Sequence, residues 1–376
     1  MPRSLKPGIY IHQRSDWPAF TWSEENLTKS LADVRHRQGK LVGRMQALGF
    51  DLRNEANLQT LTLEVLKSSE IEGEKLDPDQ VRSSIARRLG MDIAGLITAD
   101  RHVEGVVEMM IDATQNYKEE LTDERLFGWH AAMFPTGRSG MHKIRVGAWR
   151  DNTNDDPMQV VSGPIGKERV HFEAPGSEKL RKEMKAFLKW FNKTNDVDPV
   201  LKAAIAHLWF VTVHPFDDGN GRIARAIADL QLARSDESAQ RFYSMSSQIR
   251  KERNGYYDIL GKTQKGTLDI TEWLVWFLAC LDHALTSTEQ VLGNVLRKAK
   301  FWETQSVQKL NARQQKMLTK LLDHFEGKLT TSKWAKMAKC SHDTALRDIQ
   351  DLLDRKILVK DTAGGRSTGY LLEDSF

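Results

Sequence analysis

The sequence predicts a mainly α-helical protein with one short β-hairpin in its middle and a C-terminal module of helices followed by a second hairpin. Along most of the 376 residues, apolar side chains recur three and four positions apart, as they do on helices that bury one face. β-forming residues alternate with turn residues between residues 147 and 175, which is the pattern of a hairpin. A chain of this length has room for two or three domains and at least one sizeable core.

The composition argues against several classes of protein. Lys and Arg number 55 and Asp and Glu 51, and the resulting net charge of +4 does not mark a nucleic-acid binder. The two cysteines, Cys280 and Cys340, suggest neither a disulfide framework nor a cysteine-based zinc site. The N-terminus lacks the apolar core of a signal peptide, and the longest apolar run, residues 273–281, is too short to span a bilayer. We therefore expect a soluble, cytoplasmic protein without a membrane partner.

Residues 1 to about 50 predict an extended aromatic arm that leads into an amphipathic helix. Trp17 precedes a proline, which favours an extended conformation, and Ser23 followed by two glutamates is typical of a helix start. Aromatic and basic residues mixed in this way also occur in RNA-binding segments. We favour a helix laid on a core.

A second helix is predicted over residues 57–76, rich in leucine. Ser68 and Glu72 are four positions apart and therefore share one face of it, and Gly73 is placed to close it. Taken alone, this pattern is typical of a solvated, glutamate-rich helix end.

Between residues 77 and 150 two further stripes of apolar residues indicate helices, and we expect His130 to be a packed or capping residue. The hairpin is expected near residues 158–173. A helix over residues 177–192 and a break at residues 196–199 then lead to the helix that delivers His214.

Residues 214–225 read His-Pro-Phe-Asp-Asp-Gly-Asn-Gly-Arg-Ile-Ala-Arg and carry the groups that handle phosphate. Gly219 and Gly221 let the backbone approach an anion closely, and the helix that follows points its first N–H groups at the same place. Arg222 and Arg225 can bind phosphate oxygens as two-pronged donors.

The same segment contains groups for metal binding and proton transfer. The carboxylate of Asp218 is a hard oxygen ligand suited to the Mg²⁺ that accompanies a polyphosphate. A neutral imidazole at His214 could accept a proton from a hydroxyl group.

Two simpler interpretations compete with a phosphate site. Residues 219–224 also satisfy the Gly-x-Gly-x-x-Gly/Ala fingerprint of dinucleotide-binding proteins, but the residues before them recur at helical spacing and do not form a short β-branched strand. A purely structural loop is the other alternative, with Asp218 and Asn220 as turn residues. We favour the phosphate site, because seven suitable residue types stand in register.

The segment resembles the signature of Fic-domain proteins, His-x-Phe-x-(Asp/Glu)-Gly-Asn-Gly-Arg-x-x-Arg, with every fixed position filled. The resemblance implies a helical Fic core that moves AMP from ATP onto a Ser, Thr or Tyr hydroxyl of a protein, itself included, and releases pyrophosphate. It implies the following roles: general base, His214; Mg²⁺ ligand, Asp218; ATP phosphate ligands, Gly219, Asn220, Gly221, Arg222 and Arg225.

The helix end at residues 68–73 is similar to the Ser/Thr-x-x-x-Glu-(Gly/Asn) inhibitory helix of many Fic proteins, with Ser68 and Glu72 in the fixed positions. The resemblance implies that Glu72 pairs with Arg225 and occupies the guanidinium that would receive the γ-phosphate. A carboxylate there mimics and repels the same anion. Inhibition would then act within one chain.

Two further features follow from the resemblance. The hairpin would be a flap that holds the target segment by strand addition. Tyr257 would lie against the adenine ring, with Gln264 as a contact to the adenine edge; an aromatic face can stack on a base.

The last seventy-odd residues form a separate module. A strongly apolar helix over residues 273–285 and a linker helix over residues 287–308 precede it. Three short helices, a glycine turn at residues 364–365 and a hairpin resemble a winged helix-turn-helix, and its third helix would expose Ser341, His342, Thr344 and Arg347, with Arg366 on the wing. Residues 301–376 hold 13 Lys/Arg and 10 Asp/Glu, a net charge of only +3, so DNA and protein remain equal candidates as its partner.

The predicted organisation is an N-terminal arm with the inhibitory helix (residues 1–76), a Fic catalytic domain (77–290) and a winged helix (301–376). Two other functions stay open. The same loop could remove AMP from a modified protein, with Glu72 orienting the water, or the chain could be a DNA-binding regulator or a toxin–antitoxin-like unit with secondary catalysis. A homodimer is compatible with the exposed aromatic residues.

Overall fold

The computed structural model describes residues 10–373 except residues 48, 92–94, 153–155, 163–168, 195, 306–309, 323–324, 326 and 362–367. The chain divides into two compact units, residues 1–289 and 290–376. The N-terminal arm and the helix after it, which were expected to form a region of their own, belong to the first unit. The boundary between the units falls within the helix α11, so the predicted apolar helix and the predicted linker helix are one continuous element. Within the described part of the chain, no helix is both long and apolar enough to cross a membrane.

The first unit is built from helices, with two small hairpins. Its helices are α1 Glu24–Gln46, α2 Phe50–Ile71, α3 Pro78–Arg88, α4 Arg101–Gln115, α5 Asp123–Met133, α6 Leu180–Asn192, α7 Pro199–Val213, α8 Asn220–Asp236, α9 Met245–Lys251, α10 Arg253–Gln264 and the first part of α11 Thr271–Gln305. Short 3₁₀ helices lie at Ile11–Gln13 and Ser177–Lys179. The hairpins are β1 Arg138–Ser139 with β2 His142–Lys143, and β3 Gln159–Ser162 with β4 Arg169–Glu173.

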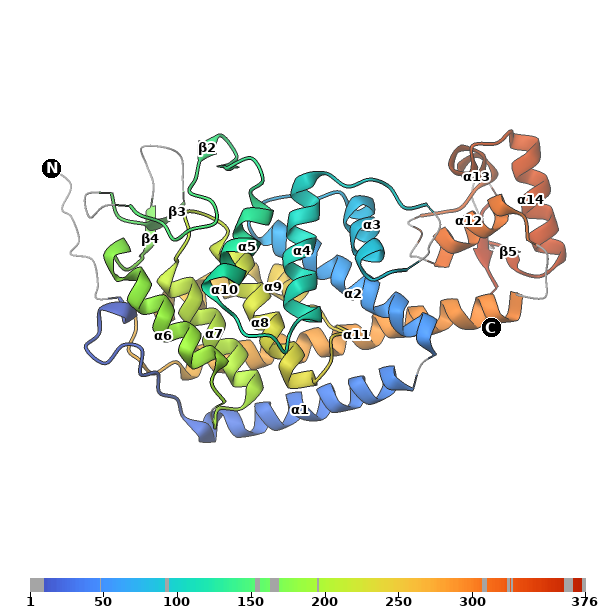
Figure 1. Cartoon of the computed structure of the whole chain (residues 1–376). Helices are drawn as coiled ribbons and strands as arrows, with labels where there is room; N and C mark the ends of the chain where they lie inside the picture. The colour runs from blue at the N-terminus through green and yellow to red at the C-terminus, as the bar shows by residue number, and fades with distance from the viewer. Residues whose placement is uncertain are drawn as a thin grey trace. The chain divides into compact units, whose positions relative to one another are not determined.

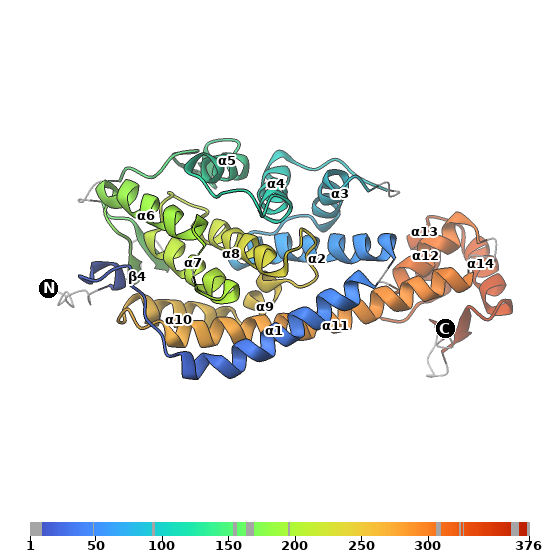
Figure 2. The same ribbon diagram turned by 60° about the horizontal axis from the view of Figure 1, so that its bottom comes forward.

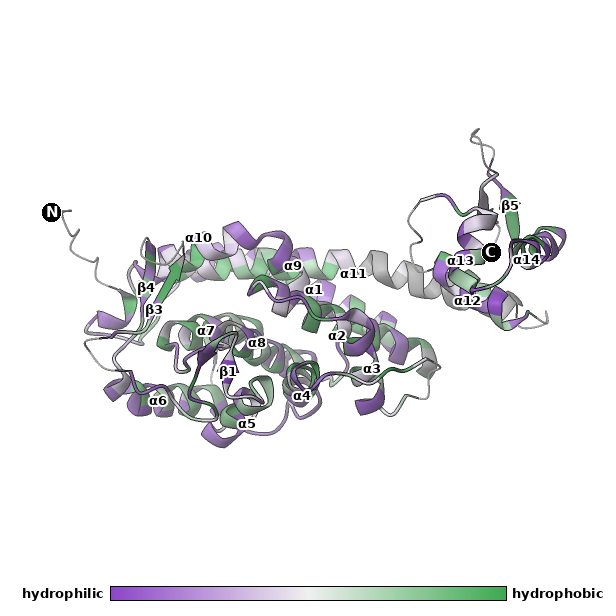
Figure 3. Cartoon of the chain, turned by 90° about the horizontal axis from the view of Figure 1, so that it is seen from above, coloured by the Kyte–Doolittle hydropathy of each residue, from purple (hydrophilic) through white to green (hydrophobic). Residues whose placement is uncertain are grey.

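The helices α7 and α8 form the centre of this unit (Figures 1 and 2). Nearly every residue of both helices is buried. The helix α7 is apolar on all its faces and is therefore covered by neighbouring segments on every side. Around the pair, α6 packs on α7, and α1, α2, α4 and α5 pack on α8. Figure 3 shows the contrast with α6, whose outer side carries hydrophilic residues. The α7–α8 turn is thus held by a rigid core.

Several predictions about the elements are confirmed. The hairpin expected near residues 158–173 is the antiparallel pair β3–β4; its glycine–proline turn lies outside the described residues. The first helix begins after Ser23. The arm packs Trp17 and Phe20 edge-on against Trp209 of α7. The small hairpin β1–β2 was not predicted.

The second helix, α2, begins seven residues earlier than predicted and ends at Ile71. Its end is a two-hydrogen-bond glycine cap. The N–H of Gly73 donates to Glu70 O at 3.1 Å and that of Glu74 to Ser69 O at 3.0 Å, while Gly73 takes φ +86°. Only glycine adopts this left-handed conformation without strain, and it therefore fixes the direction in which the chain leaves α2.

The second unit contains the predicted order of elements. After the end of α11 come α12 Ala312–Leu322, α13 Thr331–Ala338, α14 His342–Asp354, and the antiparallel strands β5 Leu358–Lys360 and β6 Tyr370–Leu372. Leu329 adds a bridge to Tyr370. The glycine turn at residues 364–365 and Arg366 lie outside the described residues. The core consists mainly of Phe301, Met317, Leu318, Trp334, Ile349 and Leu352.

Candidate functional site

The site is built at the turn between α7 and α8. His214 caps the C-terminus of α7 in the left-handed conformation, φ 51° and ψ 58°, which is uncommon for a residue with a side chain and marks a position under constraint. Gly219, at φ 80°, opens α8. The chain therefore reverses direction within six residues and aims the N–H groups at the start of α8 back toward the histidine.

Asn220 closes this turn. Its Nδ2 donates to Phe216 O at 2.7 Å, and Phe216 N donates to Asn220 Oδ1 at 2.9 Å. Phe216 is fully buried and stacks on the ring of His130, with centroids 4.3 Å apart. The side chain of Asn220 thus shapes the loop. Its expected contact with a phosphate stays a prediction, and its backbone N–H is the group left for it.

His130 has the structural role expected of it. Its Nδ1 accepts from Gly147 N and its Nε2 donates to Asp218 O, both at 3.2 Å, so the ring is neutral and fixed in one tautomer. Burial lowers its pKa to about 4, which agrees with this assignment.

His214 is present as a neutral base. Its Nδ1 lies 3.2 Å from Val211 O and therefore carries the proton, which leaves a lone pair on Nε2. Burial lowers the pKa of His214 to about 4. The contact with Val211 O is the largest opposing cause, the charge of Arg150 lowers the pKa further, and the charges of Glu72 and Asp218 make smaller contributions that raise it. The imidazole can accept a proton at neutral pH.

Arg150 holds the backbone of the turn, a role that no motif in the sequence indicated. The side chain is buried, and its Nε donates to His214 O at 2.7 Å while its backbone N donates to Pro215 O at 3.0 Å. Its Nη2 donates to Pro175 O at 2.5 Å, two residues beyond β4. One guanidinium therefore ties the α7–α8 turn to the base of the hairpin.

Asp218 presents its carboxylate at the other end of the turn. Gly219 N donates to Oδ1 at 2.5 Å and Ser139 Oγ donates to Oδ2. Among the described residues there is no group of three or more His, Cys, Asp or Glu side chains that could hold a metal. Asp218 fits a Mg²⁺ that takes its remaining ligands from phosphates and water, as this ion commonly does.

Arg225 already holds a carboxylate. The guanidinium is 2 % exposed, and its Nη2 lies 2.8 Å from Glu72 Oε1. Ser68 completes its surroundings, since Arg225 Nε donates to Ser68 Oγ and Nη2 to Ser68 O, both at 2.9 Å. The pairing expected from the sequence is thus formed. A Cβ atom at Gly221 would lie 2.2 Å from Glu72 Oε1, so this carboxylate covers the glycine.

Arg222 holds a second carboxylate. Its Nη1 lies 2.7 Å from Glu74 Oε2, and its guanidinium lies over the Phe134 ring at 5.2 Å. A cavity of about 360 Å³ lies at this point, with Glu72, Glu74, His102, Ser139, Asp218 and Arg222 in its wall. The contact of Glu74 was not foreseen. The one signal in the sequence is that Glu74 directly follows Gly73, two residues after Glu72.

The two residues expected to contact adenine differ in accessibility. Tyr257, on α10, is 37 % exposed, and Arg253 lies 5.0 Å from its ring while Arg253 Nε donates to Ile71 O at 3.0 Å. Gln264 is 4 % exposed, and its amide donates to Thr212 Oγ1 at 3.3 Å. A contact from Gln264 to adenine would require this amide to turn away from Thr212. The contact of Arg253 with the Tyr257 ring was not predicted, although its position four residues before Tyr257 on one helix could have indicated it.

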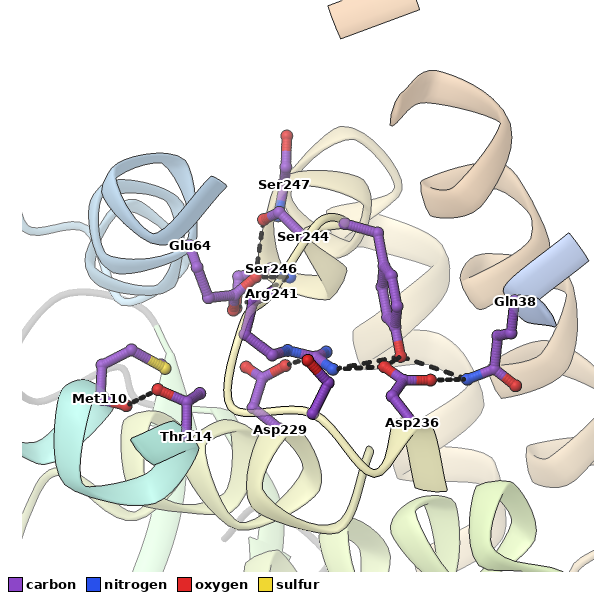
Figure 4. A network of polar contacts seen from close by, with 12 residues as sticks. Gln38, Glu64, Met110, Thr114, Asp229, Asp236, Arg241, Ser244, Ser246 and Ser247 are labelled. Atoms are coloured by element: carbon purple, nitrogen blue, oxygen red, sulfur yellow. Dashed lines mark hydrogen bonds and ion pairs between the residues drawn. The ribbon is translucent and has the colours of Figure 1, made fainter. Parts of the chain in front are cut away.

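A buried polar network fixes α2 against the rest of the unit (Figure 4). Glu64, one turn before Ser68, accepts from Ser244 Oγ at 2.6 Å and from Ser246 N at 3.0 Å. The nearby guanidinium of Arg241 pairs with two buried carboxylates, those of Asp229 at 3.0 Å and Asp236 at 2.9 Å. These contacts set the position from which Ser68, Glu72 and Glu74 reach α8.

Fold and site together define a helical protein in which two buried arginines, a neutral histidine and a helix N-terminus meet at the turn between two central helices. Residues 120–232 match the model of the Fic/DOC family, and residues 10–91 match that of a domain of unknown function, DUF4172. The chain is 26 % identical over 221 residues to "Protein adenylyltransferase Fic" of Drosophila yakuba, and this alignment covers 57 % of this chain and 39 % of that protein. It is 39 % identical over 87 residues to "Protein adenylyltransferase fic-1" of Caenorhabditis elegans, 22 % of this chain and 17 % of that protein. It thus spans less than half the length of these curated relatives.

Solved structures share the fold. A Fic family protein from Desulfovibrio desulfuricans G20 aligns with a TM-score of 0.52 at 20 % identity, over 96 % of this chain and 99 % of that one. A Fic domain containing signaling protein from Bacteroides thetaiotaomicron VPI-5482 aligns with a TM-score of 0.50 at 20 % identity, over 71 % of this chain and 97 % of that one. The mainly helical architecture predicted from the sequence is confirmed.

Proposed function

We propose that the chain is a protein adenylyltransferase that moves AMP from ATP to a hydroxyl group of a protein and that Glu72 inhibits it. The observation that carries the proposal is the loop itself: a neutral His214 at one end and the buried Arg222 and Arg225 at the other, across a glycine-opened helix N-terminus. The names of the curated relatives support the same reaction.

In the proposed reaction the hydroxyl oxygen of the target attacks the α-phosphorus of ATP. His214 Nε2 takes the hydroxyl proton, the new O–P bond forms, and the bond from the α-phosphorus to the leaving pyrophosphate breaks. The N–H groups at the start of α8 and the two arginines bind the phosphate oxygens and stabilise the charge that develops on them. A Mg²⁺ held by Asp218 would neutralise part of that charge.

In this proposal, the Glu72–Arg225 pair is the inhibited arrangement of the site. Glu72 occupies Arg225 and covers Gly221, so a phosphate that approaches this part of the loop meets a carboxylate. A charged competitor in the site excludes the ligand both by filling its place and by repelling it.

The test is intact-mass analysis after incubation with ATP and Mg²⁺. We expect Glu72→Gly to gain AMP by self-modification, while wild type and Glu72→Gly/His214→Ala do not. Glu70→Gly is a matched control, because Glu70 lies at the same helix end but pairs with Lys67 and Arg250 away from the two loop arginines. If Glu72→Gly stays unmodified and is equally inert toward added protein substrates, the proposal is wrong.

Removal of AMP is the second candidate reaction, favoured by the placement of Glu72. Its carboxylate lies against Gly221, close enough for its charge to act on His214, where it could orient a water molecule toward a bound phosphoryl group. Incubating wild type with AMP-modified protein separates the two: release of AMP by wild type and its loss in Glu72→Gly would favour removal.

The second unit is a candidate docking module. Ser341, which caps α14, and His342 and Arg347 on that helix are exposed and could contact a partner. Thr344, also expected to be exposed, is half-buried. A DNA shift that weakens with salt and survives His214→Ala would favour nucleic acid. No shift would leave protein as the partner.

A further inference from the structure

A second carboxylate contact exists beside the Glu72–Arg225 pair. Glu74 Oε2 lies 2.7 Å from Arg222 Nη1, and Glu74 Oε1 lies 2.5 Å from His102 Nε2. One carboxylate is therefore held between a guanidinium from α8 and an imidazole from α4. The Arg222 side chain is almost completely buried, and both partners line the 360 Å³ cavity.

The surroundings of His102 favour the charged form of its imidazole. Its Nδ1 lies 3.0 Å from Met133 O and its Nε2 faces the carboxylate, so both nitrogens meet oxygen acceptors. Only the doubly protonated ring supplies a proton to each. In agreement, the contact with Glu74 raises the pKa of His102 against the effect of burial. Burial works to raise the pKa of Glu74, but His102 and Arg222 outweigh it and the pKa is lowered.

The glycine cap of α2 places both carboxylates at once. Glu72 and Glu74 flank Gly73, and Arg225 and Arg222 are three positions apart on α8 and therefore share one face. Two anionic groups two positions apart in the chain thus meet two cations about one helical turn apart. Two linked phosphoryl groups would present the same pair of charges.

We propose that Arg222 and His102 form an anion subsite for a phosphoryl group of the substrate, and that Glu74 is a second intramolecular competitor that fills this subsite until the ligand displaces it. The inference rests on the proposed nucleotide site and adds to it a ligand residue, His102, and a competitor beyond Glu72. It follows that Glu72→Gly alone frees Arg225 and leaves Arg222 occupied.

The test measures binding without catalysis. Titration calorimetry with inorganic pyrophosphate compares wild type, Glu72→Gly, Glu72→Gly/Glu74→Gln, and the last with His102→Asn added. Glu74→Gln should tighten pyrophosphate about tenfold over Glu72→Gly, the order expected when one charge-assisted competitor is removed. His102→Asn should reverse most of that gain. Glu72→Gly/Glu70→Gln is the matched control and should bind as Glu72→Gly does.

Each outcome separates the inference from the proposed function. If Glu72→Gly tightens pyrophosphate and Glu74→Gln adds nothing, the second competitor is refuted while the nucleotide site stands. If Glu74→Gln tightens binding and His102→Asn leaves it unchanged, His102 only holds Glu74 and is no ligand. If no variant binds pyrophosphate, the phosphate site itself falls. Thermal melting checks that the variants fold, and His102→Gln replaces His102→Asn if the latter does not.

Discussion

At the scale of single residues, the site depends on groups held in states they rarely adopt. His214 has a left-handed backbone conformation and a neutral imidazole, and the buried Arg225 forms an ion pair with a carboxylate. The sequence indicated both residues because they stand in one short segment. Arg150, Ser139 and Glu74 could not be found in the same way, since each meets the loop from a distant part of the chain.

Replacing His214 by Ala in the Glu72→Gly background should reduce transfer by about 10²–10⁴-fold, the usual contribution of a general base. ATP affinity should stay near that of Glu72→Gly, because the base is needed in the transition state and not for holding phosphate. Calorimetry with ATP and the rate of AMP incorporation measure the two quantities. A parallel loss of both would mean that His214 only supports the fold.

The pH profile of Glu72→Gly should reflect the lowered pKa of His214. With that pKa at about 4, the imidazole remains unprotonated when the pH falls from 8 to 5, and only near pH 4 would half of it be lost as a base. An ordinary histidine would lose half its activity near pH 6.5, by the reference value. The value of kcat/KM, measured from pH 8 to 5, should therefore show no decline due to this group. A midpoint near 6.5 would contradict the assignment of His214 as the buried base.

At the scale of elements, the decisive part is the end of α2. The helix predicted over residues 57–76 ends five residues earlier, at Ile71, whereas the closing role expected of Gly73 is confirmed by the glycine cap. Two features of this helix end could not be predicted from the sequence: the hydrogen bonds by which Glu64 anchors α2, and the contact of Glu74 with Arg222 that the cap makes possible. Both depend on contacts between segments that are far apart in the chain.

Replacing Gly73 by Ala should raise self-modification above wild type, though less than Glu72→Gly does. A Cβ here meets no atom within 4 Å, so the substitution acts through the left-handed φ of +86° alone and costs about 1 kcal/mol. Gly90→Ala is the matched control, because Gly90 also has a positive φ, +67°, and open space but caps α3. Urea denaturation and intact mass should show equal destabilisation of both and activation of Gly73→Ala alone. Equal activation of both would point to general loosening.

Replacing Arg150 by Lys tests the link between the hairpin and the turn. A single ammonium cannot reproduce the forked contacts to His214 O and Pro175 O. In the Glu72→Gly background we expect a fall in kcat of about 10- to 100-fold, as misplaced catalytic groups produce, with the KM for ATP little changed. Arg145→Lys is the control, since that side chain is exposed and pairs with Asp151 at the surface. A raised KM with normal kcat would contradict a positioning role.

At the scale of the whole molecule, the chain has two units with separate cores. The sequence predicted the boundary between the two domains near residues 290–301, because the pattern of short helices begins there. It did not reveal that α11 runs through the boundary without a break, since a continuous helix and two joined helices have the same periodicity.

Deleting residues 301–376 from Glu72→Gly should leave self-modification within about twofold of the parent, because the loop and its supporting helices all lie before residue 290. Intact mass after incubation with ATP measures this. An inactive truncation that melts like the parent would show that the second unit takes part in catalysis.

If Glu72 inhibits as proposed, its attachment to the site by its own polypeptide has a kinetic consequence. A tethered competitor has a local concentration set by the chain, so diluting the protein does not release it. The substrate nucleotide therefore competes with a carboxylate whose effective concentration is constant. The nucleotide concentration that gives the half-maximal rate is raised by the same factor at every enzyme concentration. An activator that pulls on α2 would lower that factor without touching the reacting groups.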